Sequence, residues 1–219
     1  MKTAEQRQED KKARSGTILP FVHPRGKLSE KEKSIELTRK SIHLSISLAP
    51  FILSRSKSLI VALLVSGCTA YAVFETLRRQ GLHVPLISEL TSRAARFRDS
   101  GKFVLGPITL GIGALLPILL FDAPAASVAI YVLAFGDGLS SLVGKFVGGP
   151  RMPFTKGKTV AGSFTCFAVS FLSAFAVLGK AGSALIVAAV STIVEAAPTK
   201  DWDNIILPLA AGLAAAVAT

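Results

Sequence analysis

The chain has 219 residues, of which 50% are hydrophobic, and it carries a formal net charge of +11 with a mean hydropathy of +0.52. A soluble domain of this size rarely combines so much apolar content with so much unbalanced charge. Here the apolar residues form blocks that are separated by basic stretches. The composition therefore argues against a soluble domain and predicts an all-α integral membrane protein that crosses the bilayer several times.

The first segment, residues 1–34, is highly charged, and its one apolar patch is too short for the core of a secretory signal peptide. We expect a basic cytoplasmic arm that is solvated or lies on the membrane surface, followed by a transmembrane catalytic domain over residues 35–219. Because the arm lacks aromatic side chains interleaved with its basic residues, nucleic acid is not an expected partner.

The apolar blocks predict a bundle of about seven transmembrane helices. Their expected ranges are residues 35–53, 59–77, 106–121, 125–147, 159–178, 183–195 and 204–218. Several of these approach the lower limit of about 17 residues for a full span. No segment shows the alternation of polar and apolar residues that is typical of a strand.

Basic residues fill alternate connections between these helices. The connections at residues 78–105 and 148–158 are long and basic, whereas those at 54–58, 122–124 and 179–182 are short. The positive-inside rule places the N-terminus and the long basic connections in the cytoplasm. Every polar motif then lies on the cytoplasmic side, which predicts a single site that faces the cytoplasm.

The fourth predicted helix holds an aspartate inside an apolar stretch. Asp137, Ser141, Gly144, Lys145 and Gly148 fall at helical spacing on one face. A carboxylate at membrane depth is costly unless it is paired, so Asp137 marks a functional site. The two glycines allow either a ligand or a neighbouring helix to approach the backbone closely.

A basic hairpin leads into the fifth predicted helix. Lys156 and Lys158 precede the start of this helix at Gly157 or Thr159, where free backbone N–H groups can bind phosphate. A Walker A loop is excluded, because Met152 stands where its first glycine is required and no strand precedes it. The alternative is an ordinary basic loop that only sets the topology.

An acidic group precedes the seventh predicted helix. Magnesium is usually held by one or two carboxylates together with substrate phosphates, so Asp137 with Glu195 or Asp203 predicts a Mg²⁺ site. Alternatively, Asp203 caps the seventh helix. For Asp201, such a structural role is a simpler explanation than metal binding. The polar side chain of Asn204 is expected to position a ligand.

The first predicted helix opens with Glu36, Arg39, Lys40 and His43 on one side. The two basic side chains can simply extend to lipid phosphates. His43 lies one turn deeper, and we expect it to contact phosphate or substrate. At the end of the second helix, Glu75 with the following arginines forms a similar pair, either as an accessory site residue or as a structural ion pair.

Three of these segments together resemble the CTP-dependent lipid kinases, a family that includes dolichol kinase, phytol kinase and yeast-type diacylglycerol kinase. The residues that carry the resemblance are Arg39, Lys40 and His43, then Asp137, Ser141, Gly144, Gly148, Lys158, Thr159, Ala161, Gly162 and Ser163, and finally Glu195, Asp203, Asn204 and Pro208. The resemblance implies CTP as the phosphoryl donor and Mg²⁺ as the cofactor. It also implies that the acceptor is a membrane lipid alcohol, such as a polyprenol, dolichol, phytol or diacylglycerol.

A role is expected for each site residue of such a kinase. The expected catalytic residues are Asp137, His43, Arg39 and Lys158. The expected nucleotide-binding residues are Ser141, Gly144, Lys145, Gly148, Lys156, Thr159, Gly162 and Ser163. The expected metal ligands are Asp137, Glu195 and Asp203, with Lys40, Glu75 and Asn204 in supporting positions.

Two other functions stay open. The related phosphatidate cytidylyltransferases share part of the pattern, but they typically carry glutamate where this chain has Ala161, which favours a kinase. A small membrane transporter without turnover is the second alternative, although no internal repeat is visible. The small-residue faces of the helices permit a homodimer.

Overall fold

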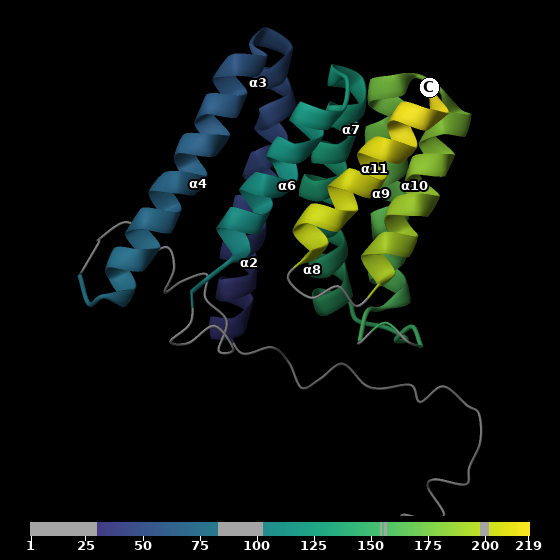
Figure 1. The fold of residues 1–219 in the computed structure, drawn as a ribbon. Coiled ribbons are helices and arrows are strands. Elements are labelled where there is room, and N and C mark those ends of the chain that lie inside the picture. Colours follow the sequence, from purple (N-terminus) through teal and green to yellow (C-terminus); the bar gives the residue numbers. More distant parts are fainter. Residues whose placement is uncertain (1–29, 83–102, 154, 156, 198–201) are drawn as a thin grey trace, which may run out of the picture.

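The computed structural model describes residues 30–82, 103–153, 155, 157–197 and 202–219 (Figure 1). These residues are all helical apart from turns and one isolated bridge between Arg151 and Thr159. Most of the predicted basic arm, residues 1–29, lies outside the described residues, and helix α2 already begins at Glu30. Lys156 and Asp201 also lie outside them.

The helices follow one another in the predicted order. The elements are α2 (Glu30–Ser45), η1 (Ile46–Leu48), α3 (Ala49–Arg55), α4 (Lys57–Arg79), α6 (Gly106–Leu120), α7 (Ala123–Tyr131), the π segment η3 (Val132–Asp137), α8 (Gly138–Phe146), α9 (Val160–Leu178), α10 (Ala181–Ala196) and α11 (Asp203–Ala218). Because α2, η1 and α3 are continuous, as are α7, η3 and α8, the described residues form seven helical stretches.

Three of these stretches are long and apolar enough to cross a membrane, namely Lys57–Arg79, Ala123–Phe146 and Val160–Leu178. Helices α6, α10 and α11 are apolar but shorter. The described residues therefore confirm the helical class, and their seven helical stretches follow the predicted order. Seven crossings and a cytoplasmic N-terminus stay predictions.

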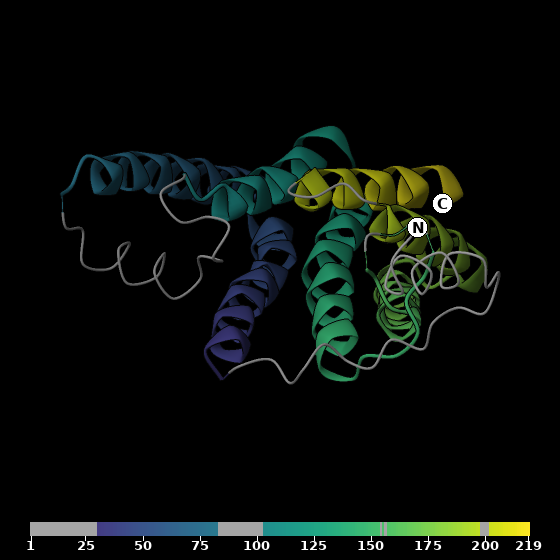
Figure 2. The same cartoon turned by 90° about the horizontal axis from the view of Figure 1, so that it is seen from below.

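The helices form two packed layers. Helices α4, α6 and α11 lie side by side in one layer, and α2, α8, α9 and α10 lie behind them (Figure 2). Helix α7 joins the layers because it packs against α6, α9 and α11. Figure 1 also shows that the α3–α4 turn and the C-terminus lie at one end of the bundle, whereas α2 and α11 begin at the other.

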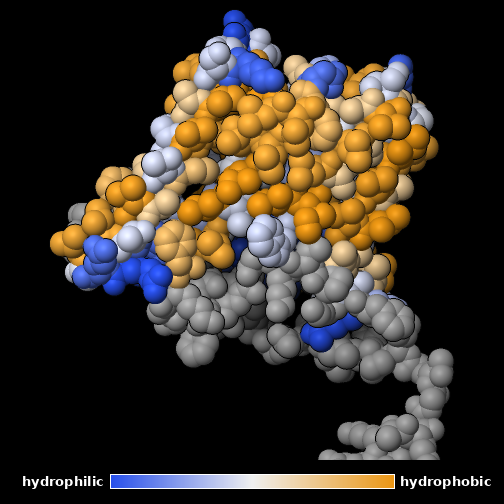
Figure 3. Space-filling model, viewed as in Figure 1, coloured by the Kyte–Doolittle hydropathy of each residue, from blue (hydrophilic) through white to orange (hydrophobic). Residues whose placement is uncertain are grey.

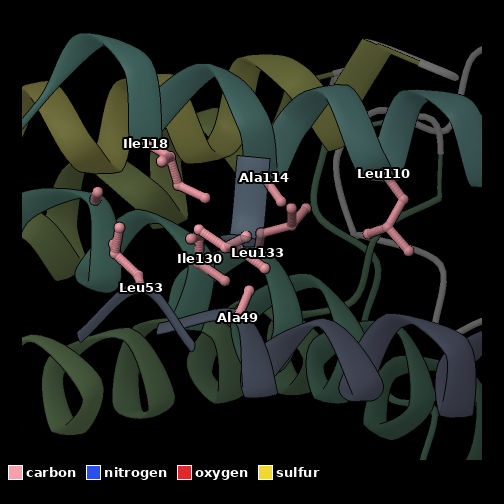
Figure 4. Close-up of a cluster of buried hydrophobic side chains, with 9 residues drawn as sticks. Ala49, Leu53, Leu110, Ala114, Ile118, Ile130 and Leu133 are labelled. Atoms are coloured by element: carbon pink, nitrogen blue, oxygen red, sulfur yellow. The ribbon is translucent and has the colours of Figure 1, made fainter. Parts of the chain in front are cut away.

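Two buried apolar clusters hold the layers together. The first joins α3, α4, α6, α7 and η3 through side chains such as Leu53, Ile118 and Leu133 (Figure 4). The second joins α7, α9, α10 and α11 and is rich in alanine and valine, which lets these helices approach closely. The face of the molecule in Figure 3 is apolar over the middle of the helices, with hydrophilic residues at the upper end and at the lower left. Such an extended exposed apolar surface is typical of a membrane-embedded protein.

Candidate functional site

Asp137 lies at the end of the π segment η3 and is only 7% exposed. Its Oδ2 atom accepts a hydrogen bond of 2.8 Å from Nζ of Lys40 on α2, and the same ammonium donates to the Asp137 carbonyl oxygen at 3.1 Å. Both side chains are almost completely buried. Asp137 is therefore paired with Lys40, which was predicted to support the site and lies 97 positions away in the sequence.

His43 faces the same carboxylate. Its Nδ1 atom lies 3.4 Å from Oδ2 of Asp137 and has no hydrogen-bond partner within the described part of the chain, although the side chain is buried. Buried polar atoms are nearly always hydrogen-bonded in native proteins. The imidazole therefore leaves one buried hydrogen-bonding position open beside the Asp137 carboxylate.

A second group of charges joins α2 to α8 one turn nearer the polar end of the bundle. Oε1 of Glu36 lies 2.6 Å from Nζ of Lys145 and accepts a 3.2 Å hydrogen bond from the Ser141 hydroxyl. Oε2 lies 3.5 Å from the Arg39 guanidinium. Asp137, Ser141 and Lys145 therefore face α2 together, as their spacing predicts. The helical spacing predicts Glu36 on the same side of the first helix as Arg39 and Lys40, but it predicts no role for Glu36.

The glycines of α8 and α9 serve close packing. A Cβ atom on Gly144 would lie 2.9 Å from Oγ1 of Thr159, and one on Gly162 would lie 2.9 Å from the carbonyl oxygen of Ser140. The predicted common face needs a correction here, because Gly144 faces α9 and not α2. Gly148 lies beyond the end of α8 with a φ of +72°, so it belongs to a turn and not to the predicted helical face.

The N-terminus of α9 also needs a correction. Two N–H groups that were expected to bind phosphate already have partners, because Val160 N–H donates to the Pro150 carbonyl and Gly162 N–H donates to the Thr159 hydroxyl. Thr159 is therefore the N-cap of α9. The charge at this position comes from Lys158, which is only partly buried.

Lys158 is paired with the predicted metal ligand Glu195. Its Nζ atom lies 2.5 Å from Oε1 of Glu195, and the Ser163 hydroxyl donates to Oε2 at 3.4 Å. Glu195 is 4% exposed. The pair joins the start of α9 to the end of α10, and it is the third buried carboxylate of the site whose partner is a lysine.

The start of α11 is fixed by a residue that sequence reasoning missed. The Asn204 side chain donates a 2.9 Å hydrogen bond to Oγ1 of Thr109 on α6, and Oδ1 of Asp203 accepts from the Asn204 N–H at 3.0 Å. Thr109 is a polar residue within an apolar block, and this was the only sign in the sequence that it makes a specific contact. Asp203 is the first residue of α11, so it is not the N-cap that the alternative reading required. It interacts electrostatically with Asp137 and Lys158.

The three predicted metal ligands do not form a ready-made metal site. No group of three or more His, Cys, Asp or Glu side chains that could hold a metal ion occurs among the described residues. Asp137 and Glu195 each lie against a lysine instead. A cation at this position would need oxygen ligands from a bound phosphate in addition to these carboxylates.

Glu75 belongs to a different cluster. It is fully buried, its two oxygens accept 2.7 Å hydrogen bonds from Arg78, and Oε1 also accepts from the Val104 N–H at 3.2 Å. The Tyr71 hydroxyl donates to the Val104 carbonyl oxygen at 3.0 Å. These contacts tie the end of α4 to the residues before α6, so the geometry favours the structural ion pair over the accessory site residue.

The chain is similar to known proteins over more than half of its length. The chain is 30% identical over 153 residues to probable phytol kinase 1, chloroplastic, of Oryza sativa subsp. japonica, which covers 62% of this chain and 49% of that protein. It is 30% identical over 178 residues to an uncharacterised protein of Methanocaldococcus jannaschii, which covers 79% of this chain and 88% of that protein. The chain belongs to the phytol kinase family.

Within this family, phytol kinase 1, chloroplastic, of Arabidopsis thaliana is 27% identical over 153 residues and covers 62% of this chain and 50% of that protein. The chain thus spans about half the length of these plant phytol kinases. No family model matches the chain, and no solved structure matches it significantly. Membership of the phytol kinase family confirms the resemblance that the sequence motifs predicted.

Proposed function

We propose that this member of the phytol kinase family is a membrane lipid kinase that transfers the terminal phosphoryl group of a nucleotide to the hydroxyl group of a lipid alcohol. The observation that carries the proposal is the buried Asp137, with Lys40 and His43 against its carboxylate at the polar end of an apolar bundle. The plant relatives that are named phytol kinases support this class of reaction.

Phosphoryl transfer requires positioning and charge neutralisation more than covalent catalysis by the protein. The hydroxyl oxygen of the lipid forms a bond to the terminal phosphorus as the bond from that phosphorus to the bridging oxygen breaks, and a nucleoside diphosphate leaves. We expect Asp137 and His43 to orient the hydroxyl group and to receive its proton. Lys145, Lys158 and Arg39 lie at the same end of the bundle and would neutralise the phosphates.

We expect a magnesium ion to arrive with the nucleotide, because the carboxylates alone form no ready-made metal site among the described residues. Mg²⁺ usually takes one or two carboxylates, waters and phosphate oxygens, and Asp137 with Asp203 or Glu195 would supply the carboxylates. When bound, the ion would neutralise charge on the phosphates. CTP as the donor rests on the family resemblance alone.

The bundle suits an amphiphilic acceptor. The lipid chain would stay in the bilayer beside the apolar helices, and its hydroxyl group would meet the nucleotide at the polar end, which we place in the cytoplasm. The identity of the alcohol is open among phytol, polyprenols including dolichol, and diacylglycerol. A homodimer is compatible with this arrangement, and the reaction does not require one.

The test uses purified protein, Mg²⁺ and a panel of these alcohols, with phosphatidic acid as a further acceptor. Parallel reactions contain CTP labelled at the γ- or the α-phosphorus, and γ-labelled ATP tests the choice of donor. Label that enters an alcohol only from a γ-position supports the kinase and identifies its substrate. Label that enters phosphatidic acid only from α-labelled CTP would instead show a cytidylyltransferase, and no transfer to any acceptor would overturn both.

A further inference from the structure

Glu36 is a buried carboxylate that contacts three residues expected to handle the nucleotide. It is 5% exposed, and its two oxygens lie 2.6 Å from Lys145, 3.2 Å from the Ser141 hydroxyl and 3.5 Å from Arg39. Ser141 and Lys145 come from α8, and Arg39 comes from the next turn of α2. One carboxylate therefore gathers two cations and a hydroxyl group from two helices.

The contacts of Glu36 form the second rung of a charge ladder between α2 and α8. In the first rung the cation Lys40 lies on α2 and the anion Asp137 lies at the start of α8. In the second rung the signs are reversed, because the anion Glu36 lies on α2 and the cation Lys145 lies on α8. The rungs are one turn apart on α2 and two turns apart on α8. A one-turn shift of α2 would bring Glu36 towards Asp137 in one direction or Lys40 towards Lys145 in the other, so the ladder opposes a change of register between the two helices.

This register determines where the cations lie relative to Asp137. Lysine and arginine side chains are long, and each loses about 2 kcal/mol of rotamer freedom when it is held in one place. A phosphate that met mobile cations would have to supply this ordering at the moment of binding, which weakens affinity. Glu36 orders Lys145 and Arg39 before the nucleotide arrives.

We propose that Glu36 is a positioning residue for the nucleotide phosphates and acts through Lys145, Ser141 and Arg39. This inference rests on the proposed kinase function. Its oxygens are occupied by cationic and hydroxyl donors, so it acts through these groups and not as a metal ligand.

The experiment compares Mg–CTP binding by calorimetry and steady-state turnover in Glu36→Gln, Lys145→Met and the double variant. Hydrogen bonds to charged groups contribute enough that we expect the Kd and KM for CTP of Glu36→Gln to rise about tenfold. The KM for the lipid alcohol should be unchanged. The loss of affinity in the double variant should be smaller than the sum of the two single losses, because part of the effect of Glu36 passes through Lys145.

Two further variants separate positioning from stability. Glu36→Asp keeps the charge and should recover part of the nucleotide affinity, whereas Asp122→Asn removes a carboxylate that caps α7 at the opposite end and should leave KM unchanged. Equal affinity of Glu36→Gln and wild type, or additive losses in the double variant, would overturn the role of Glu36. Wild-type protein that neither binds Mg–CTP nor transfers phosphate would instead overturn the proposed function.

Discussion

At the residue scale, the buried ion pair between Asp137 and Lys40 affects stability as well as the proposed activity. Removing one partner of a buried ion pair leaves an uncompensated charge and typically costs about 3–5 kcal/mol, whereas replacing both partners is often neutral. Both of these side chains are at least nine-tenths buried. Stability and activity should therefore respond differently to single and double substitution of the pair.

We expect Asp137→Asn to lower both the melting temperature and the turnover number, because the Lys40 ammonium loses its counter-ion and the reaction loses its carboxylate. In Asp137→Asn/Lys40→Met the melting temperature should recover, since neither position then carries a charge, while turnover stays at least about 100-fold below wild type. Thermal unfolding in detergent and the lipid kinase assay measure the two effects. Near-normal turnover by folded Asp137→Asn would contradict the assignment.

At the element scale, the contact between α8 and α9 depends on the absence of side chains. Gly144 and Gly162 face each other across this contact, and Thr159 packs beside both while it caps α9. Helix α8 carries Ser141 and Lys145, and Lys158 directly precedes the Thr159 cap of α9. Any increase in the distance between α8 and α9 therefore moves the cations of the site apart.

Gly162→Ala tests this contact. Its Cβ would lie 2.9 Å from the Ser140 carbonyl oxygen and 3.2 Å from Oγ1 of Thr159, so we expect a loss of about 1–3 kcal/mol in stability together with a higher KM for CTP. Gly182→Ala is the matched control, because it is also helical but a Cβ there meets nothing within 4 Å. It should be neutral or slightly stabilising in thermal unfolding. A normal KM in Gly162→Ala would show that the site tolerates separation of the two helices.

The elements were more predictable from the sequence than their contacts. Blocks of apolar residues are local signals, and they predicted all seven helical stretches in order. The pairing of Glu195 with Lys158 and the hydrogen bond between Asn204 and Thr109 join residues 37 and 95 positions apart, so no local pattern contains them. The face assigned to Gly144 was wrong for a related reason: helical spacing gives the direction of a side chain but not which neighbouring helix lies there.

At the scale of the whole molecule, the two ends of the bundle differ in chemistry. One end holds the short turns at Ser56 and Asp122 and the C-terminus of the chain. The other end holds the three carboxylate–lysine pairs and the beginning of α11. This separation agrees with the alternation of short and basic connections in the sequence, and the orientation in the membrane is the part that needs an experiment.

Cysteine labelling in cells determines the orientation. In a background without Cys68 and Cys166, we expect Asp122→Cys to react with a membrane-impermeant thiol reagent in intact cells. Arg151→Cys lies at the basic end and should react only after the membrane is permeabilised, because the positive-inside rule places it in the cytoplasm. The reverse pattern would place the site on the outer face.

The length of the π segment sets how α8 is rotated relative to α7. One residue corresponds to about 100° of rotation in an α-helix, and a π turn holds more residues than an α turn. The number of residues in Val132–Asp137 therefore sets the angle between the apolar face of α7 and the side of α8 that meets α2. A substitution in this segment leaves that angle intact. The loss of a single residue would turn Ser141 and Lys145 away from Glu36 with every amino acid of the site still present.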